Sequence, residues 1–320
     1  MSPSTPAAAG RKKTSVSVGG HTIELSHTHK VLFPGEGITK GDLIEYYRRV
    51  AKHMLPYVEG RPVMMQRYPD GIGGESFYQK DVPDYFPRWV KTARVKKVGG
   101  SIRQVIISDA ATLVYLANQA CITPHVWLSR AGNVHRPDVM IFDLDPSGTN
   151  FSDVRSAARL LREILDNLGL AVFAKTTGSR GLHVVVPLDG NADFDAVREF
   201  ARDVARVAVS RDPTRLTMEV RKAKRGKRVF IDTLRNAYAA TAVAPFAVRA
   251  RAGAPIATPV SWEEVSGRSL TPQRYTLVNI LTRLRRRRDP WAGFWRRARG
   301  LSRPRKKLDS MLRSAESEAQ

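Results

Sequence analysis

The sequence predicts a mixed α+β protein: a split βαβ unit of the RRM or ferredoxin-like type, with a flanking α/β region on its N-terminal side. Three observations predict this class. In the middle of the chain, apolar runs and amphipathic helical runs follow one another in the order β-α-β-β-α-β. Hydrophobic residues make up 42% of the 320 residues, which is enough for one or two packed domains. Segments of low complexity lie at the two ends.

The six elements of the split unit follow from local patterns. Apolar runs rich in Val, Ile and Phe indicate strands, and apolar residues spaced three and four apart indicate helices. The elements are a strand at 139–145, a helix that Ser152 caps and Gly169 closes, strands at about 171–175 and 182–188, a helix from Phe194, and a strand at 228–234. In the usual order of such a sheet, the first strand lies between the third and the fourth, and both helices cover one face. Three remote segments therefore converge on the first strand.

Composition divides the chain into three parts. Residues 1–19 are rich in Ser, Thr, Pro and Ala and indicate a disordered leader. Residues 20–285 form the predicted domain, with an N-terminal part at 20–130 and a catalytic core at 131–265. Residues 286–320 form a basic C-terminal tail.

The charge predicts a polyanionic partner. The chain has 53 Lys and Arg against 30 Asp and Glu, a formal net charge of +23, and nucleic acid is the commonest partner for such an excess. Trp291, Phe294 and Trp295 are interleaved with arginines in the tail. These aromatic residues could stack on bases while the arginines hold phosphates, or they could dock a terminal helix while the arginines face solvent.

Other classes are disfavoured by what the sequence lacks. No run approaches the roughly 18 apolar residues of a membrane span, and residues 1–20 contain no secretory h-region. The single cysteine, Cys121, excludes an intramolecular disulfide and a Cys-rich zinc site. A cytoplasmic protein is expected.

Acidic residues mark a candidate metal site. Asp143 and Asp145 are two apart on one strand and share a face, and Asp232 lies on the fourth strand beside the first. If Asp232 points to that face, three carboxylates gather and require cations, and oxygen ligands favour Mg²⁺ or Mn²⁺. Two such ions serve phosphoryl and nucleotidyl transfer. Alternatively, the Asp-Pro-Ser-Gly stretch at 145–148 is a simple turn at the end of the strand.

The loop between the second and third strands carries groups suited to a triphosphate. Hydroxyls, glycines that permit close backbone approach, and positive donors alternate there. These residues are Thr177, Gly178, Ser179, Arg180, Gly181 and His183. The ordinary meaning of such a loop is a tight hairpin, and its position next to the carboxylates is what favours a nucleotide site.

These motifs together resemble the archaeo-eukaryotic primase superfamily, and within it the polymerase domain of the bacterial end-joining ligase, ligase D. The superfamily pattern is Asp-x-Asp, then small-x-His, then hydrophobic-Asp. This chain matches it with Asp143-Leu144-Asp145, Gly181-Leu182-His183 and Ile231-Asp232. Longer blocks that resemble the ligase D domain lie at 29–47, 61–87, 109–130 and 228–265.

The resemblance implies a template-dependent DNA/RNA polymerase, a metal-dependent nucleotidyltransferase that adds NTPs or dNTPs at gaps or broken ends of DNA. Its metal ligands would be Asp143, Asp145 and Asp232, with Mn²⁺ or Mg²⁺ in a two-metal site. The implied roles of other residues are nucleotide binding by His125, Thr177, Gly178, Arg180, His183 and Arg249, binding of a DNA 5′-phosphate by Lys30 and Lys40, and stacking on the template by Phe77 and Tyr78. A separate DNA ligase and Ku are the implied protein partners, at the bacterial nucleoid.

Without the family these residues are less distinctive. Lys30 and Lys40 could be surface lysines, and His125 a buried histidine with satisfied hydrogen bonds. Phe77 and Tyr78 are adjacent, so that in a strand they face opposite ways and one could be core.

Three points qualify the resemblance. Thr177 stands where the family usually has Ser, and its retained hydroxyl could bond the 2′-OH that distinguishes NTPs from dNTPs. Tyr238 departs from the small or basic residue expected at its position. We find neither a ligase lysine motif nor a nuclease-like His/Asp cluster, so the chain resembles a stand-alone polymerase. Two other classes remain open: a haloacid-dehalogenase-like phosphatase with Asp143 as nucleophile, and a non-catalytic DNA-end-binding module.

Overall fold

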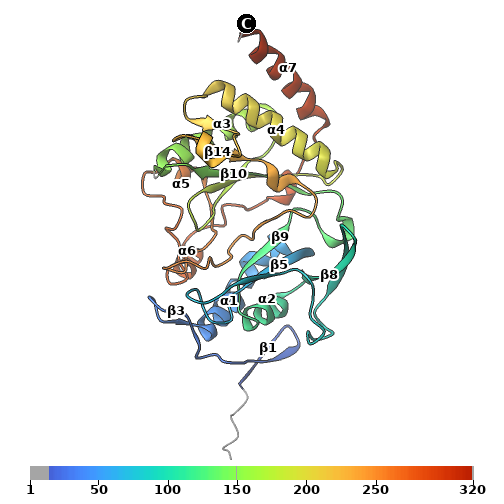
Figure 1. Cartoon of the computed structure of the whole chain (residues 1–320), viewed down its shortest axis with the longest axis vertical. Helices are drawn as coiled ribbons and strands as arrows, with labels where there is room; N and C mark the ends of the chain where they lie inside the picture. The colour runs from blue at the N-terminus through green and yellow to red at the C-terminus, as the bar shows by residue number, and fades with distance from the viewer. Residues whose placement is uncertain (1–13, 149, 319–320) are drawn as a thin grey trace, which may run out of the picture.

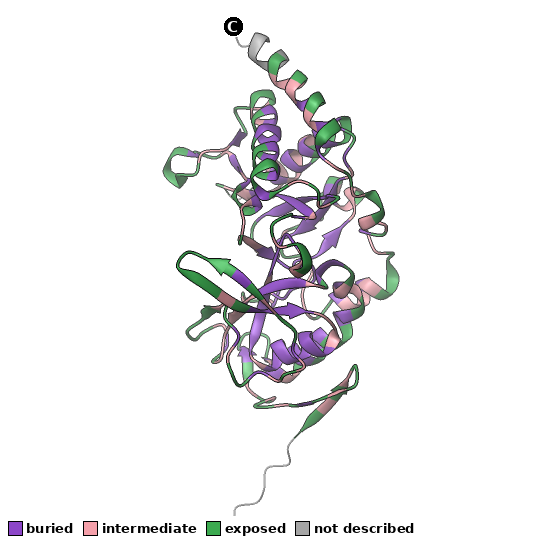
Figure 2. Ribbon diagram, turned by 90° about the vertical axis from the view of Figure 1, so that its right-hand side faces the viewer, coloured by how far each residue is buried: buried purple, intermediate pink, exposed green. Residues whose placement is uncertain are grey.

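A computed structural model describes residues 14–148 and 150–318. Two β-sheets, each with helices on its outer side, follow one another along the long axis of the molecule (Figure 1). Most strands of the two sheets and the inner faces of the helices that pack on them are buried, whereas β6 (Phe77–Gln79) and β7 (Thr92–Lys97) are largely exposed (Figure 2). No helix of the described part is long and apolar enough to cross a membrane.

The first sheet, here the N-terminal sheet, belongs to the flanking α/β region. Its strand order is β15-β9-β5-β8-β7, and β6 also pairs with β5. The strands are β5 (Arg61–Arg67), β6 (Phe77–Gln79), β7 (Thr92–Lys97), β8 (Gly100–Ile107), β9 (Cys121–Trp127) and β15 (Thr241–Val243). Helices α1 (Lys40–Val58) and α2 (Ala110–Asn118) pack against it. A capping box begins α1: the Asp42 amide donates to the Thr39 hydroxyl, and the Asp42 carboxylate accepts from the Thr39 amide.

Two short hairpins precede α1. They are formed by β1 (Ser15–Val18) with β2 (His21–Glu24) and by β3 (Val31–Phe33) with β4 (Ile38–Thr39). The leader predicted at 1–19 therefore does not extend that far: residues 15–18 are a strand because the Ser-Val alternation turns Val16 and Val18 toward the core. Residues 1–13 lie outside the described part.

The second sheet, here the central sheet, has the predicted split βαβ topology. Its order is β13-β14-β10-β12-β11-β16, with β10 between β14 and β12, and all pairs are antiparallel except β13 with β14. The strands are β10 (Val139–Pro146), β11 (Phe173–Thr176), β12 (Leu182–Pro187), β13 (Leu216–Thr217), β14 (Val229–Asp232) and β16 (Pro259–Val260). Helices α3 (Phe151–Asn167) and α4 (Phe194–Arg211) both cover one face. The N-cap of α3 is Asn150, and not Ser152 as predicted, because the Asn150 side chain accepts the Ser152 amide hydrogen.

Alternation along β10 separates the two faces of the central sheet. Met140, Phe142 and Leu144 share a hydrophobic core with α3 and α4. Val139 and Ile141 belong instead to the core shared with the N-terminal sheet. Asp143 continues this second series, so the carboxylates lie at the seam between the sheets.

The chain after β14 ties the two sheets together. Strand β15 returns to the N-terminal sheet and pairs with β9, and β16 then joins the edge of the central sheet. Between them, the hydroxyl of Tyr46 donates to Phe246 O at 2.7 Å and that of Thr123 to Val248 O at 2.7 Å. The segment that connects the sheets is therefore held to the N-terminal side by hydrogen bonds as well as by apolar packing.

Packing continues beyond residue 285, where the charge pattern placed the end of the domain. Trp291 and Phe294 are buried between the sheets, and the Trp291 indole donates to Ala174 O at 2.9 Å. The indole of Trp295 donates to Pro56 O. The tail aromatics therefore dock, as the second of the two interpretations predicted, while Arg296, Arg297 and Arg299 stay exposed.

Two further helices, α5 (Trp262–Ser266) and α6 (Ile280–Arg286), follow β16. The last helix, α7 (Ser302–Glu318), projects from the top of the molecule (Figure 1). Leu308 is buried on the inner face of α7, and the Arg305 guanidinium forms an ion pair with Asp203 on α4 at 2.9 Å. This ion pair fixes the base of α7 to the central sheet's helical layer.

Candidate active site

Four polar side chains form a row across the central sheet at the seam. Asp232 on β14 is the register partner of Asp143 on β10, Asp143 is the partner of His183 on β12, and His183 is the partner of Lys175 on β11. Directly opposed residues in antiparallel strands have Cβ atoms about 4.5–5.5 Å apart, so the row is continuous. Asp145, two residues along β10, lies on the same face. The sheet register therefore brings together the three predicted carboxylates and His183.

A pocket of about 140 Å³ opens over this row. Residues from both sheets and from the connecting segment line it: His125, Asp143, Asp145, Thr177, Ser179, His183, Arg235, Thr241–Val243 and Arg249. Six of the predicted metal and nucleotide residues thus meet in one cavity. Arg180 is exposed and not among the lining residues, although its charge opposes part of the rise that burial causes in the pKa of Asp145.

The carboxylates form a cluster with excess negative charge. Burial by itself raises the pKa of Asp143, but His183, Arg235 and Lys175 together bring it down to about 2. Burial raises the pKa of Asp145, and the neighbouring Asp143 raises it further. Burial also raises the pKa of Asp232, with a further contribution from Asp143 that the Leu234 amide opposes. Asp143 is thus the carboxylate most stabilised as an anion, whereas at Asp145 and Asp232 burial and the charge of Asp143 outweigh the opposing arginines.

The donor set suits a hard divalent cation. All three predicted ligands are carboxylates, and Asp143 Oδ1 is buried with His183 Nε2 3.3 Å away but without a hydrogen bond from any described residue. As placed, no three acidic, His or Cys side chains of the described residues converge closely enough to enclose an ion. The residues therefore fit Mg²⁺ or Mn²⁺ in their chemistry and in their order along the sheet.

The loop at 177–181 is pressed against β10. A Cβ on Gly181 would lie 2.1 Å from Leu144 O, so no larger residue fits there. Gly178 has a φ of +63°, and a Cβ there would lie 2.8 Å from Arg249 Cγ. The Arg249 guanidinium donates to Thr177 O at 2.9 Å. Both glycines therefore bring the loop backbone and Arg249 next to the carboxylates.

The Thr177 hydroxyl serves the loop itself. It donates to Gly181 O at 3.1 Å and accepts from the amides of Ser179 and Gly181 at 3.2 Å. Its only proton is therefore already donated. The expectation that Thr177 is available to bond a ribose 2′-OH is not supported by this geometry.

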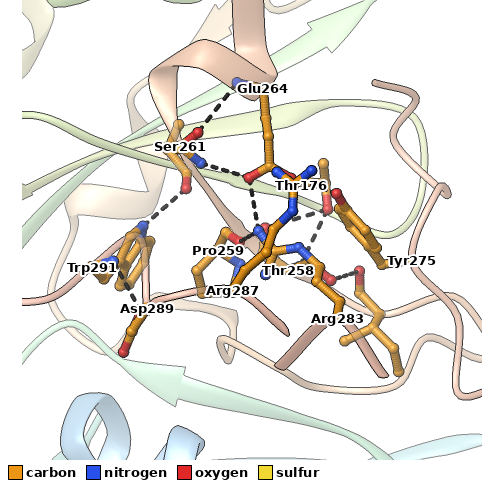
Figure 3. Close-up of polar contacts among 12 residues, drawn as sticks. Thr176, Thr258, Pro259, Ser261, Glu264, Tyr275, Arg283, Arg287, Asp289 and Trp291 are labelled. Carbon is orange, nitrogen blue, oxygen red and sulfur yellow. Dashed lines mark hydrogen bonds and ion pairs between the residues drawn. The ribbon is translucent and has the colours of Figure 1, made fainter. Parts of the chain in front are cut away.

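A polar network around Glu264 extends to Thr176, the residue that precedes the loop (Figure 3). Glu264 accepts hydrogen bonds from the Arg283 guanidinium at 2.7 Å and the Tyr275 hydroxyl at 2.5 Å. Arg283 also donates to Pro259 O at 3.1 Å, next to Thr258. Thr258 in turn accepts from the Thr176 amide at 2.9 Å. The base of the loop is thereby fixed by groups from the segment after β16.

Two residues of the site were not predicted from the sequence. Lys175 is buried, its ammonium donates to Val243 O at 2.9 Å, and burial lowers its pKa to about 7. Arg235 Nε lies 3.5 Å from Asp143 Oδ2 and 3.9 Å from Asp232 Oδ2. The available signals were the position of Lys175 within a strand beside the loop and the spacing of Arg235 three residues after Asp232.

The two histidines of the pocket are uncharged at neutral pH. Burial and then Arg249 lower the pKa of His125 to about 3, and burial and then Lys175 lower that of His183 to about 4. His125 Nε2 and His183 Nδ1 find no hydrogen-bond partner among the residues described. His125 is therefore not the satisfied core histidine of the simpler interpretation.

Lys30 and Lys40 lie together on the N-terminal side. The Lys40 amide donates to Lys30 O at 2.8 Å. The Lys40 ammonium is buried and donates to Ser26 Oγ at 3.0 Å and Asn118 O at 2.9 Å, whereas Lys30 is half-exposed and pairs with Asp70. Burial, followed by the charge of Lys30, lowers the pKa of Lys40 to about 8. Lys40 is thus no ordinary surface lysine, and one of its three donors remains available.

Phe77 and Tyr78 are both exposed, at 46% and 57%, so neither is a core residue. The guanidinium of Arg67 lies 5.4 Å from the Phe77 ring centroid. The Tyr78 ring meets His125 edge-on at 6.0 Å, which places this pair at the rim of the pocket. Tyr238 packs between Trp127 and His135, so it contributes to the core.

Comparison with known proteins shows which sequences and structures this chain resembles. The sequence-family model described as LigD, primase-polymerase domain, matches residues 39–291 of this chain. The Multifunctional non-homologous end joining DNA repair protein LigD of Mycobacterium tuberculosis is 32% identical over 282 residues, covering 85% of this chain and 37% of that protein. The Bifunctional non-homologous end joining protein LigD of Bacillus subtilis is 30% identical over 276 residues, covering 86% and 44%.

A solved structure is similar over the same region. The polymerase domain of Mycobacterium tuberculosis ligase D, in complex with DNA, aligns with a TM-score of 0.81 and 30% identity, covering 86% of this chain and 99% of that one. An antiparallel sheet that carries three carboxylates on its face at the seam, the face opposite the helices, defines the class as a primase-polymerase. The chain belongs to the LigD primase-polymerase domain family.

Two further facts concern the extent of the match and the alternative fold class. The chain spans well under half the length of the curated relatives it matches. The antiparallel central sheet also excludes the haloacid-dehalogenase alternative, whose doubly wound sheet is parallel.

Proposed function

We propose that this chain is a template-dependent nucleotidyltransferase that adds NTPs or dNTPs to DNA at gaps or broken ends, in repair by end joining or gap filling. The observation that carries the proposal is the register row of Asp232, Asp143 and His183, closed by a glycine loop, in a chain of the LigD primase-polymerase family. The names of the relatives, which are non-homologous end joining proteins, support the repair context.

In this proposal, Asp143, Asp145 and Asp232 would hold Mn²⁺ or Mg²⁺, and the ion, when bound, would supply neutralising charge and favour ionisation of the attacking hydroxyl. The primer 3′-oxygen forms a bond to the α-phosphorus while the bond to pyrophosphate breaks. Arg249, oriented by Thr177 O, holds the polyphosphate together with the loop amides. The neutral rings of His125 and His183 can donate N–H groups to phosphate oxygens without adding charge.

The N-terminal side would hold the DNA. Lys30 and Lys40, whose backbones are hydrogen-bonded, would provide two ammonium groups for a 5′-phosphate across the gap, and Phe77 and Tyr78 would provide exposed rings for stacking on the template. A DNA ligase and Ku are the protein partners that this role predicts, at the nucleoid. Acceptance of ribonucleotides and good activity with Mn²⁺ remain part of the prediction.

The test is primer extension on a gapped duplex with a 5′-phosphate, supplied with NTPs or dNTPs and Mn²⁺ or Mg²⁺. We expect the wild-type chain to extend the primer, and Asp143→Asn and Asp232→Asn to abolish extension while retaining DNA binding. Asp166→Asn, on the outer face of α3, is the control and should extend normally. Binding of gapped DNA without extension by the wild-type chain under all these conditions would favour the non-catalytic end-binding module.

A further inference from the structure

Arg235 stands over the two facing carboxylates. Its Nε atom is 3.5 Å from Asp143 Oδ2 and 3.9 Å from Asp232 Oδ2, and the side chain lines the pocket. Among the described residues, no other Lys or Arg side chain forms an ion pair with either carboxylate. Arg235 is therefore the one described Lys or Arg side chain within ion-pair distance of both carboxylates, while the buried Lys175 acts on Asp143 from farther away.

The backbone that carries Arg235 is fixed to β10. The next residue, Asn236, is buried, its amide group donates to Ile141 O at 2.7 Å, and its Oδ1 accepts from the Ile141 amide at 2.9 Å. On the other side, the Leu234 amide donates to Asp232 Oδ1 at 2.7 Å. The position of the Arg235 Cα relative to the carboxylates is therefore fixed.

The side chain, in contrast, can move. It is 46% exposed, and both distances to the carboxylates exceed the range of a hydrogen bond. An exposed pair of this length is weak, and a divalent cation that ligates the same oxygens directly is a stronger partner. The guanidinium and a metal ion cannot occupy the space between these two oxygens together, because their positive charges repel.

We propose that Arg235 is an internal counter-cation: it neutralises Asp143 and Asp232 in the nucleotide-free protein, competes with divalent ions there, and turns toward the polyphosphate when nucleotide and metal enter. The inference rests on the proposed metal site. It follows that the nucleotide-free protein binds metal weakly. Tight metal binding requires bound nucleotide.

The test measures Mn²⁺ binding, by electron paramagnetic resonance of free Mn²⁺, to the nucleotide-free chain. Arg235→Gln should lower the Kd for Mn²⁺ by about threefold to tenfold, the range expected when a repelling charge is removed from a half-exposed site. Arg235→Lys keeps the charge and should stay near the wild-type Kd. Arg198→Gln removes the same net charge from the exposed face of α4 and should leave the Kd unchanged.

Adding a non-hydrolysable nucleoside triphosphate provides the second arm. The phosphates themselves add affinity for Mn²⁺ in both proteins, so the telling quantity is the difference between them: the wild-type and Arg235→Gln Kd values should converge, because Arg235 has left the carboxylates of the wild-type chain. An unchanged or raised Kd for Arg235→Gln in the nucleotide-free chain would overturn the inference, and so would undetectable Mn²⁺ binding by both proteins.

Asp143→Asn separates this inference from the proposed function. If Asp143→Asn removes Mn²⁺ binding but Arg235→Gln does not alter it, the metal site stands and the role of Arg235 fails. If Asp143→Asn leaves Mn²⁺ binding intact, the metal site itself is misplaced.

Discussion

His183 Nε2 lies 3.3 Å from Asp143 Oδ1, and the two residues are register partners on adjacent strands. Their proximity is therefore set by the ladder of a buried sheet and not by a loop. Because burial lowers the pKa of His183 to about 4, the ring is neutral at pH 7 and the contact is that of a dipole with a carboxylate. A one-residue slip of β12 would turn His183 to the helical face, so the register and the site are specified together.

The pKa of Lys40 predicts a pH-dependent preference for phosphorylated ends. Burial lowers that pKa to about 8, so the ammonium loses its proton as the pH rises through 8. We expect the ratio of affinities for gapped DNA with a 5′-phosphate and with a 5′-hydroxyl to be constant from pH 7 to 7.5 and to fall by pH 9.5. The measurement is fluorescence anisotropy with both duplexes at fixed salt.

Lys40→Met is the matched control. It should show little preference for the 5′-phosphate at any pH, and a wild-type ratio that does not vary with pH would remove Lys40 from the phosphate site.

The lowered pKa of Lys40 has the opposite effect on the stability of the fold. Between pH 8 and 10.5 the unfolded chain binds more protons at Lys40 than the folded chain, so the contribution of Lys40 to the free energy of unfolding rises with pH.

Thr177→Val tests the role of the loop hydroxyl. Because this hydroxyl bonds Ser179 and Gly181 within the loop, its loss should lower incorporation of NTPs and dNTPs alike, with their ratio unchanged. Thr177→Ser should retain both activities. Steady-state incorporation of paired NTP and dNTP substrates measures this, and a selective loss of NTP use would return the 2′-OH contact to Thr177.

Gly181→Ala should damage the site through the backbone. The added Cβ would lie 2.1 Å from Leu144 O, so the loop must move away from β10. We expect loss of nucleotide binding and destabilisation of about 1–3 kcal/mol, as for other overpacked positions. Gly132→Ala, where a Cβ meets nothing within 4 Å, is the control, and equal unfolding midpoints in denaturant for the two variants would contradict the prediction.

Trp291→Ala should destabilise the whole chain. Trp291 is 3% exposed and contacts Tyr57 and Phe294 between the sheets, so its truncation should cost about 3–5 kcal/mol. Urea unfolding measures this, with Trp295→Ala as a less buried comparison. A chain that ends at residue 285 should lack cooperative unfolding, whereas one that ends at residue 301 should keep it. Cooperative unfolding of the shorter chain would show that the tail aromatics are dispensable.

The exposed arginines of the tail can be tested without cutting the core. Replacing Arg296, Arg297 and Arg299 by Gln should weaken binding to all DNA substrates alike. It should also reduce the slope of log K against log salt by about 0.9 for each DNA phosphate that these arginines neutralise in the wild-type chain. The preference for a 5′-phosphate should persist. An unchanged slope would mean that these arginines are only solvated.

The sequence was sufficient for the central sheet because its elements have clean local periods. Strand alternation alone places Asp143 and Asp145 on one face, and the split βαβ order alone brings Asp232 and His183 beside them. In both cases a short-range pattern and a common topology agree. The predicted order of strands and the shared helical face are both confirmed.

The remaining features depend on remote partners that no local pattern contains. Lys175 is buried because Val243 O, from a strand of the other sheet, accepts a hydrogen bond from its ammonium group. From the sequence alone, a lysine is expected to be exposed. The buried positions of Trp291 and Phe294 were obscured by the arginines around them. The inward orientation of Val16 and Val18 likewise appears only when β2 is present to pair with β1.

The pairing of β15 with β9 also has a consequence for how the chain folds during its synthesis. Trp127 leaves the ribosome long before Thr241, its register partner, so the apolar edge of β9 emerges without its neighbour. An unpaired apolar edge is a template for pairing with other chains. The yield of folded protein should therefore depend on how quickly translation delivers residues 128–243, and on chaperones that cover β9 in the meantime.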